Sequence, residues 1–144
     1  MNVGGLEFPD DLRVMTEHDV WARLHSDGTA TVGITALGVR LSGEIYMCRP
    51  RPVGTEVDAG RAIAVVELAK AIVSVKSPVA GRVIEVNALL AERPEVVHLD
   101  PYGTGWLARI ALRDPDTAGD PLVSGEPLAT AVLERMRLER LDGA

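Results

Sequence analysis

The sequence predicts a mainly β protein, a sandwich or a barrel, that ends in one amphipathic helix. Short apolar runs recur along the chain, and each is bounded by a turn that contains glycine, as is typical of folds built from many short strands. Near the carboxyl end, Leu128, Val132, Met136 and Leu138 recur at near-helical spacing with charges between them. The 144 residues, 47% of them apolar and 25% charged, suffice for one domain with a sizeable core. We therefore expect a single domain over residues 1–144.

The predicted elements follow from these runs in chain order. Strands are expected where β-branched and other apolar residues cluster between turns, at 21–24, 29–34, 43–48, 62–68, 71–75, 81–86 and 105–112. Helices are expected at 35–41, 88–92 and 126–141. The acidic, turn-rich segment 113–125 is predicted to be a connection without regular secondary structure. The core of the domain then covers residues 16–112, and the last helix docks on it by one face.

Net charge, cysteine count and hydropathy each exclude a class of function or location. With 21 acidic and 15 basic residues the net charge is −6, which repels a nucleic-acid backbone. The one cysteine, Cys48, allows neither an internal disulfide nor a cysteine zinc site, which suits a reducing cytoplasm. The most apolar stretch, 61–75, is interrupted by Glu67 and Lys70 and is too short to span a membrane, and no secretory signal is recognisable. We expect a cytoplasmic protein that binds neither nucleic acid nor membrane.

Lysine is scarce in this chain and is confined to one segment. Thirteen of the 15 basic residues are arginines, and the two lysines are Lys70 and Lys76. An amine can lose its proton and be acylated, whereas a guanidinium cannot. Codon bias is the simpler explanation of the count alone, so the residues around each lysine must decide.

Residues 62–76 predict a hairpin whose two-residue turn consists of Ala69 and Lys70. Its register gives both strands one apolar surface for the core: Ala64, Val66, Leu68, Val73 and Val75. The other surface is half polar and suited to partial exposure: Ile63, Val65, Glu67, Ile72, Ser74 and Lys76. Turns of this length prefer asparagine, aspartate or glycine, so the alanine and lysine at the tip indicate a function. An accessible amine on a rigid support is what an acylating enzyme needs.

Five blocks of sequence between residues 16 and 112 carry a family resemblance. They are Asp-Gly-Thr-Ala-Thr-Val-Gly-Ile-Thr at 27–35, Val-Gly-Thr-Glu-Val at 53–57 with Gly60, Val-Glu at 66–67 with Lys-Ala at 70–71, Ser-Pro-Val-Ala-Gly at 77–81, and Asp-Pro-Tyr-Gly at 100–103 with Gly-Trp-Leu at 105–107. In order and spacing they resemble the lipoyl-carrying H protein of the glycine cleavage system. The resemblance implies a barrel-sandwich hybrid of the lipoyl- and biotinyl-carrier type, with short helices and a C-terminal helix.

The same resemblance implies a site. The lipoylated lysine of the family matches Lys70, and Glu67 and Ala71 match its modification motif. The implied cofactor is lipoate in amide linkage to Lys70, attached by a lipoate ligase or by an octanoyl transferase with lipoyl synthase. In biotin carriers the lysine usually lies between two methionines, so Ala69 and Ala71 argue against biotin. The chain is then a non-catalytic carrier subunit of a multi-enzyme system, with no catalytic residue and no metal of its own.

Several positions on the expected contact surface depart from the family pattern. They are His18, the segment 46–52, Val73, Ser74, Lys76 and His98, which stands at a usual asparagine position. These segments resemble a divergent branch of lipoate-binding proteins that serves sulfur oxidation with a heterodisulfide-reductase-like complex, and we predict that pathway. The alternative is the glycine cleavage system, in which the carrier takes an aminomethyl group from glycine decarboxylase to aminomethyl transferase and is reoxidised by dihydrolipoamide dehydrogenase.

Two further hypotheses stay open at this point. One is an unmodified β-sandwich interaction module that has kept the fold and lost the carrier role. The other is a small enzyme with Cys48 as its nucleophile, although a cysteine on a strand is more often a small buried hydrophobe. The three histidines, His18, His25 and His98, show no metal-ligand spacing.

Overall fold

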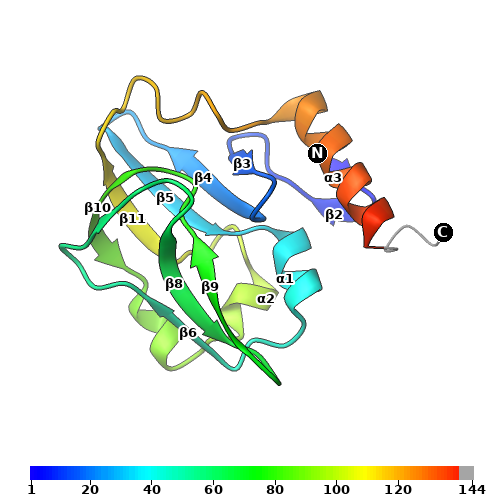
Figure 1. The fold of residues 1–144 in the computed structure, drawn as a ribbon, viewed down its shortest axis with the longest axis horizontal. Coiled ribbons are helices and arrows are strands. Elements are labelled where there is room, and N and C mark those ends of the chain that lie inside the picture. Colours follow the sequence, from blue (N-terminus) through cyan, green and yellow to red (C-terminus); the bar gives the residue numbers. More distant parts are fainter. Residues whose placement is uncertain (140–144) are drawn as a thin grey trace.

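In the computed structural model, which describes residues 1–139, two antiparallel sheets enclose an apolar core and short helices flank them (Figure 1). The larger sheet has six strands, the smaller has three, and the first residues form a separate two-stranded ribbon. The mainly β class, the short helices and the C-terminal helix are thereby confirmed. Within residues 1–139, no helix is both long enough and apolar enough to cross a lipid bilayer.

The larger sheet consists, in spatial order, of β3 (Arg13–Met15), β4 (Val20–Leu24), β5 (Thr29–Ile34), β11 (Ala108–Leu112), β10 (Gly81–Val86) and β7 (Glu56–Val57). In this sheet Gly33 of β5 lies opposite Trp21 of β4. A Cβ atom at Gly33 would come within 2.5 Å of the indole ring, which is fully buried. The glycine therefore makes room for the largest side chain of the core.

The smaller sheet consists of β6 (Met47–Pro50), β8 (Ala62–Glu67) and β9 (Ile72–Lys76), with β8 in the centre. The N-terminal ribbon pairs β1 (Asn2–Val3) with β2 (Leu6–Glu7). Alternate residues of β8 face inward, where Ala64 and Val66 are each 1% exposed. The inner face of the smaller sheet thus closes the core that the larger sheet leaves open.

Buried apolar side chains form two clusters on the two faces of β4. Val20 and Ala22 belong to the cluster between the sheets, and Trp21 belongs to the other. This second cluster is completed by Phe8 near the N-terminus and by Leu128 of the last helix. Because successive residues of a strand point to opposite faces, β4 serves both clusters.

Four helical segments of the described chain connect or cover the strands. They are α1 (Ala36–Ser42), the 3-10 helix η1 (Ala88–Ala91), α2 (Val96–Leu99) and α3 (Gly125–Leu138). The Thr35 side chain accepts the Gly38 N–H at 3.1 Å and so caps α1. As the helical spacing predicts, α3 buries Leu128, Val132 and Met136. The prediction is wrong for Leu138, which is the last residue of the helix and is 63% exposed. The predicted end of this helix at residue 141 lies outside the described residues.

Two predicted strands begin too early. The prediction of 43–48 is wrong in its first four residues, because Gly43, with a φ of 73°, ends α1 and a connection precedes β6. The strand predicted at 105–112 is observed only from Ala108, because the N–H of Gly105 is used within a turn. Five elements of two to four residues were not predicted, because segments this short show no periodicity. They are β1, β2, β3, β7 and α2.

Candidate functional site

The hairpin of β8 and β9 has the predicted register. Its facing pairs include Ala64 with Val75 and Val66 with Val73. The Leu68 N–H donates to the Ala71 carbonyl at 2.8 Å, which closes a turn with two central residues. Lys70 is the second of these central residues, so its side chain starts at the tip of a hairpin that extends past the neighbouring elements (Figure 1).

The prediction of which hairpin residues are buried is correct at the base and wrong near the tip. Ala64 and Val66 are buried, but Val73 is 39% exposed and Leu68 is only half-buried, because a hollow lies beside them instead of a packed element. Ile63, expected on the half-exposed surface, is 1% exposed. A register shift at the start of β8 turns it inward.

The two lysines differ in their surroundings. Lys70 is exposed, and no hydrogen bond or ion pair reaches its ammonium from any residue that the structure describes. Both residues that flank Lys70, Ala69 and Ala71, are exposed and carry only a methyl group. Lys76 is half-buried on β9, and its Nζ donates to Ser74 Oγ at 2.7 Å. Of the two amines, the one at the tip is therefore the more accessible to a second protein.

Glu67 lies at the end of β8, three residues before Lys70. Its side chain is exposed, and it faces Ile72 of β9, which is 69% exposed. The Glu67 carbonyl accepts the N–H of Tyr46, which ties the end of β8 to the start of β6. The Glu67 carboxylate and the Lys70 amine therefore lie on the same exposed end of the smaller sheet, held from both sides by strand pairing.

A pocket of about 280 Å³ adjoins the hairpin. Leu68 and Val73 form part of its apolar wall, and Asp19 and Arg135 contribute polar groups. Arg135 Nη2 donates to Asp19 Oδ2 at 2.8 Å, and Nη1 donates to the Thr16 carbonyl at 3.0 Å. The C-terminal helix thereby supplies a charged wall to a pocket beside the hairpin.

Burial and pairing act in opposite directions on Asp19. Burial raises the pKa of the Asp19 carboxyl above its ordinary value, and the charge and hydrogen bond of Arg135 partly offset this rise. Sequence reasoning missed this pair because 116 residues separate its members and neither lies in a motif. No local signal marks it, since lone charges in a turn and on a helix are usually solvated.

Cys48 lies on β6 with its side chain in the core. It is 3% exposed, and burial raises the pKa of its thiol to about 12. The thiolate is the reactive form of cysteine, so a thiol with this pKa is a poor nucleophile near neutral pH. The structure thus favours a packing role for Cys48 over the hypothesis of a cysteine enzyme.

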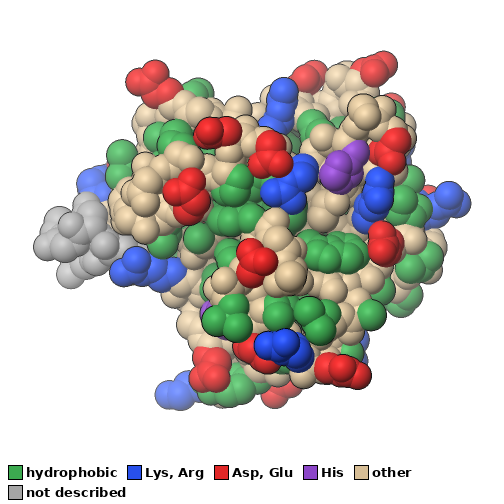
Figure 2. Space-filling model, turned by 180° about the vertical axis from the view of Figure 1, so that it is seen from behind, with side chains coloured by type: hydrophobic (Ala, Val, Ile, Leu, Met, Phe, Trp, Pro, Cys, Tyr) green, Lys and Arg blue, Asp and Glu red, His purple; other side chains and the backbone are tan. Residues whose placement is uncertain are grey.

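His25 and His98 form hydrogen bonds within the fold, and the charges on the surface are of mixed sign. His25 Nε2 lies 2.8 Å from Thr31 Oγ1, and His98 Nε2 accepts the Ile45 N–H at 2.9 Å. Within the described part of the chain, no three His, Cys, Asp or Glu side chains lie close enough to hold a metal ion. On the face shown in Figure 2, acidic and basic side chains are interspersed among apolar ones. The described residues on that face form no continuous basic surface.

The comparisons with known proteins agree with this geometry. The family model for the glycine cleavage H-protein matches residues 12–135. The chain belongs to this family. A glycine cleavage system H protein of Halorhodospira halophila is 42% identical over 108 residues, which are 75% of this chain and 82% of that protein. A "Probable glycine cleavage system H protein 2" of Saccharolobus solfataricus is 36% identical over 137 residues, or 94% and 92% of the two chains.

A solved structure extends the likeness to three dimensions. The crystal structure of a glycine cleavage system H protein from Mycobacterium marinum matches with a TM-score of 0.74 at 29% identity. The match covers 85% of this chain and 97% of that one. The barrel-sandwich architecture implied by the sequence blocks is therefore the fold of an H protein.

Membership in the H-protein family decides between some of the hypotheses. H proteins are non-catalytic carrier subunits with a covalently attached lipoate, so the expectation of a carrier in place of an enzyme is confirmed. The predicted sulfur-oxidation pathway and its heterodisulfide-reductase-like partner have no support in these comparisons. The relatives carry the glycine cleavage name and favour the alternative pathway.

Proposed function

We propose that this protein is the lipoyl carrier of a glycine cleavage system and that its lipoyl group is attached to Lys70 Nζ. The observation that carries the proposal is the exposed Lys70 ammonium at a hairpin tip, which has no partner among residues 1–139, in a chain of the H-protein family. The half-buried Lys76, whose Nζ is hydrogen-bonded to Ser74, is the only other lysine and offers a poorer target.

The residues around Lys70 fit attachment of an acyl group. Acylation forms an amide bond at Nζ, releases a proton from the amine, and expels the leaving group of an activated acid that a modifying enzyme brings. The methyl side chains of Ala69 and Ala71 give such an enzyme access, and the exposed Glu67 offers it a charged contact. We assign Glu67 and Ala71 to the recognition motif of that enzyme, a lipoate ligase or an octanoyl transferase that acts with lipoyl synthase.

The protein itself holds the lipoyl arm and presents it to the partner enzymes. When bound, lipoate supplies a cyclic disulfide at the end of a flexible arm, and redox and group-transfer chemistry resides in its sulfurs. Strand pairing of β8 with β6 and β9 holds the root of the arm. The pocket beside the hairpin offers Leu68 and Val73 to apolar groups and the paired Asp19 and Arg135 to polar ones. Tethering raises the concentration of the arm at a docked partner to about millimolar.

The partners follow from the pathway. We propose glycine decarboxylase, aminomethyl transferase and dihydrolipoamide dehydrogenase, which the arm would visit in turn. A cytoplasmic location suits a chain whose one cysteine is buried and unpaired.

The test of attachment is intact mass after co-expression with a lipoate ligase and free lipoate. Wild type and Lys76→Arg should gain the mass of one lipoyl group, whereas Lys70→Arg should not. Arginine keeps the charge but cannot be acylated, so the two variants are matched. A mass gain that survives Lys70→Arg and vanishes in Lys76→Arg would overturn the assignment. A wild type that gains no mass under conditions that lipoylate a known H protein would point to the unmodified interaction module.

A further inference from the structure

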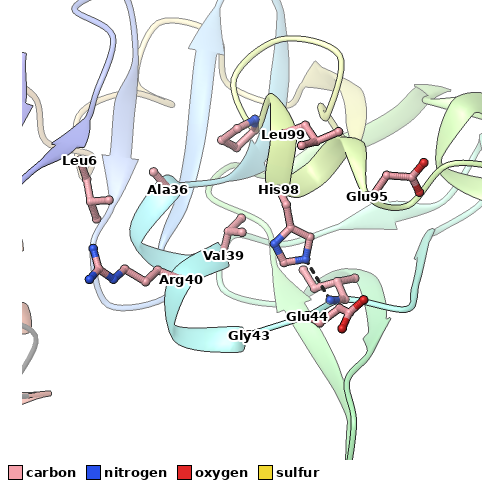
Figure 3. A pocket seen from close by; sticks show the side chains of 11 residues that line it. Leu6, Ala36, Val39, Arg40, Gly43, Glu44, Glu95, His98 and Leu99 are labelled. Carbon is pink, nitrogen blue, oxygen red and sulfur yellow. Dashed lines mark hydrogen bonds between the residues drawn. The ribbon is translucent and has the colours of Figure 1, made fainter.

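A single hydrogen bond ties α2 to the connection between α1 and β6. His98 on α2 accepts the backbone N–H of Ile45 through its Nε2 atom at 2.9 Å (Figure 3). Ile45 lies in the connection of residues 43–46 and is 3% exposed. The N–H of Ile45 is therefore shielded from water, and the imidazole is the acceptor that satisfies it.

This bond requires a neutral imidazole. A backbone N–H can only donate, so Nε2 must present its lone pair and the ring proton must sit on Nδ1. A protonated imidazolium has two N–H donors and no acceptor. When a proton from solvent binds Nε2, the hydrogen bond to Ile45 is lost and two donors face each other.

His98 lies at an open pocket and among charged side chains. The ring lies at the wall of an open pocket of about 600 Å³, so solvent protons can reach it. Three charged side chains line the same pocket: Arg40 from α1, Glu44 from the connection and Glu95 at the start of α2 (Figure 3). The pocket residue from β2, Leu6, is uncharged. Solvent protons can therefore reach the ring, and the charged groups near it come from α1, from the connection and from α2.

The connection leads directly to the strands that hold Lys70. Tyr46, the residue after Ile45, donates its N–H to the Glu67 carbonyl at 2.8 Å. Glu67 ends β8, and the next residue, Leu68, makes the hydrogen bond that closes the turn. Loss of the anchor at Ile45 therefore loosens the start of β6, which is one of the two supports of the hairpin tip.

We propose that His98 is a proton-sensitive latch that fastens the connection 43–46 when neutral and releases it when protonated. Release frees the Tyr46 end of β6 and lowers the order of the hairpin tip. The latch belongs to this chain's own backbone and does not depend on lipoylation, so it can be tested on the unmodified protein.

The test is amide hydrogen exchange by NMR on the full unmodified chain between roughly pH 8 and pH 5.5, the range in which histidine titrates. Rates are divided by the intrinsic rate at each pH, which removes the ordinary pH dependence of exchange. In wild type, the protection of the Ile45 and Tyr46 amides should fall about tenfold or more across this range. His98→Gln places an amide oxygen near the position of Nε2 and accepts at any pH, so its protection should stay constant.

Two controls isolate the latch. His25→Gln removes a histidine that bonds to Thr31 elsewhere, and it should behave as wild type. In wild type itself, the ring nitrogen shifts of His98 should titrate with the same midpoint as the loss of Ile45 protection, which keeps the test valid if His98→Gln is poorly folded. Constant protection in wild type, an equal fall in His98→Gln, or different midpoints would overturn the proposal.

Discussion

Replacing Val66 with aspartate tests the position of Lys70 through the register of its hairpin. Val66 is 1% exposed and faces Val73, so the variant removes an apolar side chain from the core and adds a carboxylate. The lost burial costs about 1.5–3 kcal/mol, and a buried charge without a partner costs about 3–5 kcal/mol. Because small domains are stable by about 5–15 kcal/mol, Val66→Asp should lose a large part of the total.

Ile72→Asp provides a matched control on the neighbouring strand. Ile72 is also β-branched, but it is 69% exposed, so the same acid there stays in water. A surface change of this kind costs about 1 kcal/mol or less. Urea unfolding of the two variants and wild type at neutral pH measures the difference. Equal losses in both variants, or an unchanged midpoint for Val66→Asp, would show that the register and the tip position of Lys70 are wrong.

The pH dependence of Val66→Asp adds a second check. Burial raises the pKa of the introduced carboxyl in the folded state, so its neutral form is the one that the fold tolerates. The variant should be least destabilised below roughly pH 4, the ordinary range of an aspartate, and should lose stability as the pH rises through the raised pKa. Ile72→Asp should show no such trend relative to wild type.

Two further predictions concern the pocket and the core. Asp19 has a raised pKa in the folded state, so it favours folding most when protonated, and Arg135 limits the loss of stability as the pH rises. Arg135→Met should therefore lower the free energy of unfolding by about 1–3 kcal/mol at neutral pH, a range that allows for the partial exposure of the pair. At roughly pH 4 the loss should be smaller. Equal losses in thermal unfolding at the two pH values would contradict the pairing. Cys48, with a thiol pKa raised to about 12, should react with iodoacetamide only after unfolding, and rapid alkylation of the folded protein would refute its burial.

The hairpin and its tip could be predicted because their determinants are local. The register of β8 and β9 follows from alternation within 15 residues, and the lysine at the turn breaks a strong turn preference. Burial near the tip could not be predicted, since Val73 faces a pocket whose other walls include residues of α1 and α3. The Ile63 side chain points inward because of a bulge in the strand pairing, and no pattern in the sequence indicates that bulge.

Contacts between distant segments could not be predicted from the sequence for a related reason. Asp19 and Arg135 are 116 residues apart, and His98 and Ile45 are 53 apart, so their pairing follows only from the packing of whole elements. His98 departs from the family pattern, but nothing in the sequence indicates that the Ile45 N–H is its partner. A contact between distant segments also explains why β6 begins only at Met47. The Ile45 N–H donates to His98 and not to a neighbouring strand.

The most direct test of the account is glycine turnover in a reconstituted glycine cleavage system that contains this chain as its carrier. The lipoylated wild type should support glycine-dependent release of carbon dioxide at a rate near that of an established H protein, and Lys76→Arg should do the same. Lys70→Arg and the unlipoylated chain should be inactive. Turnover that persists in Lys70→Arg would contradict the site, and a fully lipoylated wild type that does not turn over glycine would contradict the pathway.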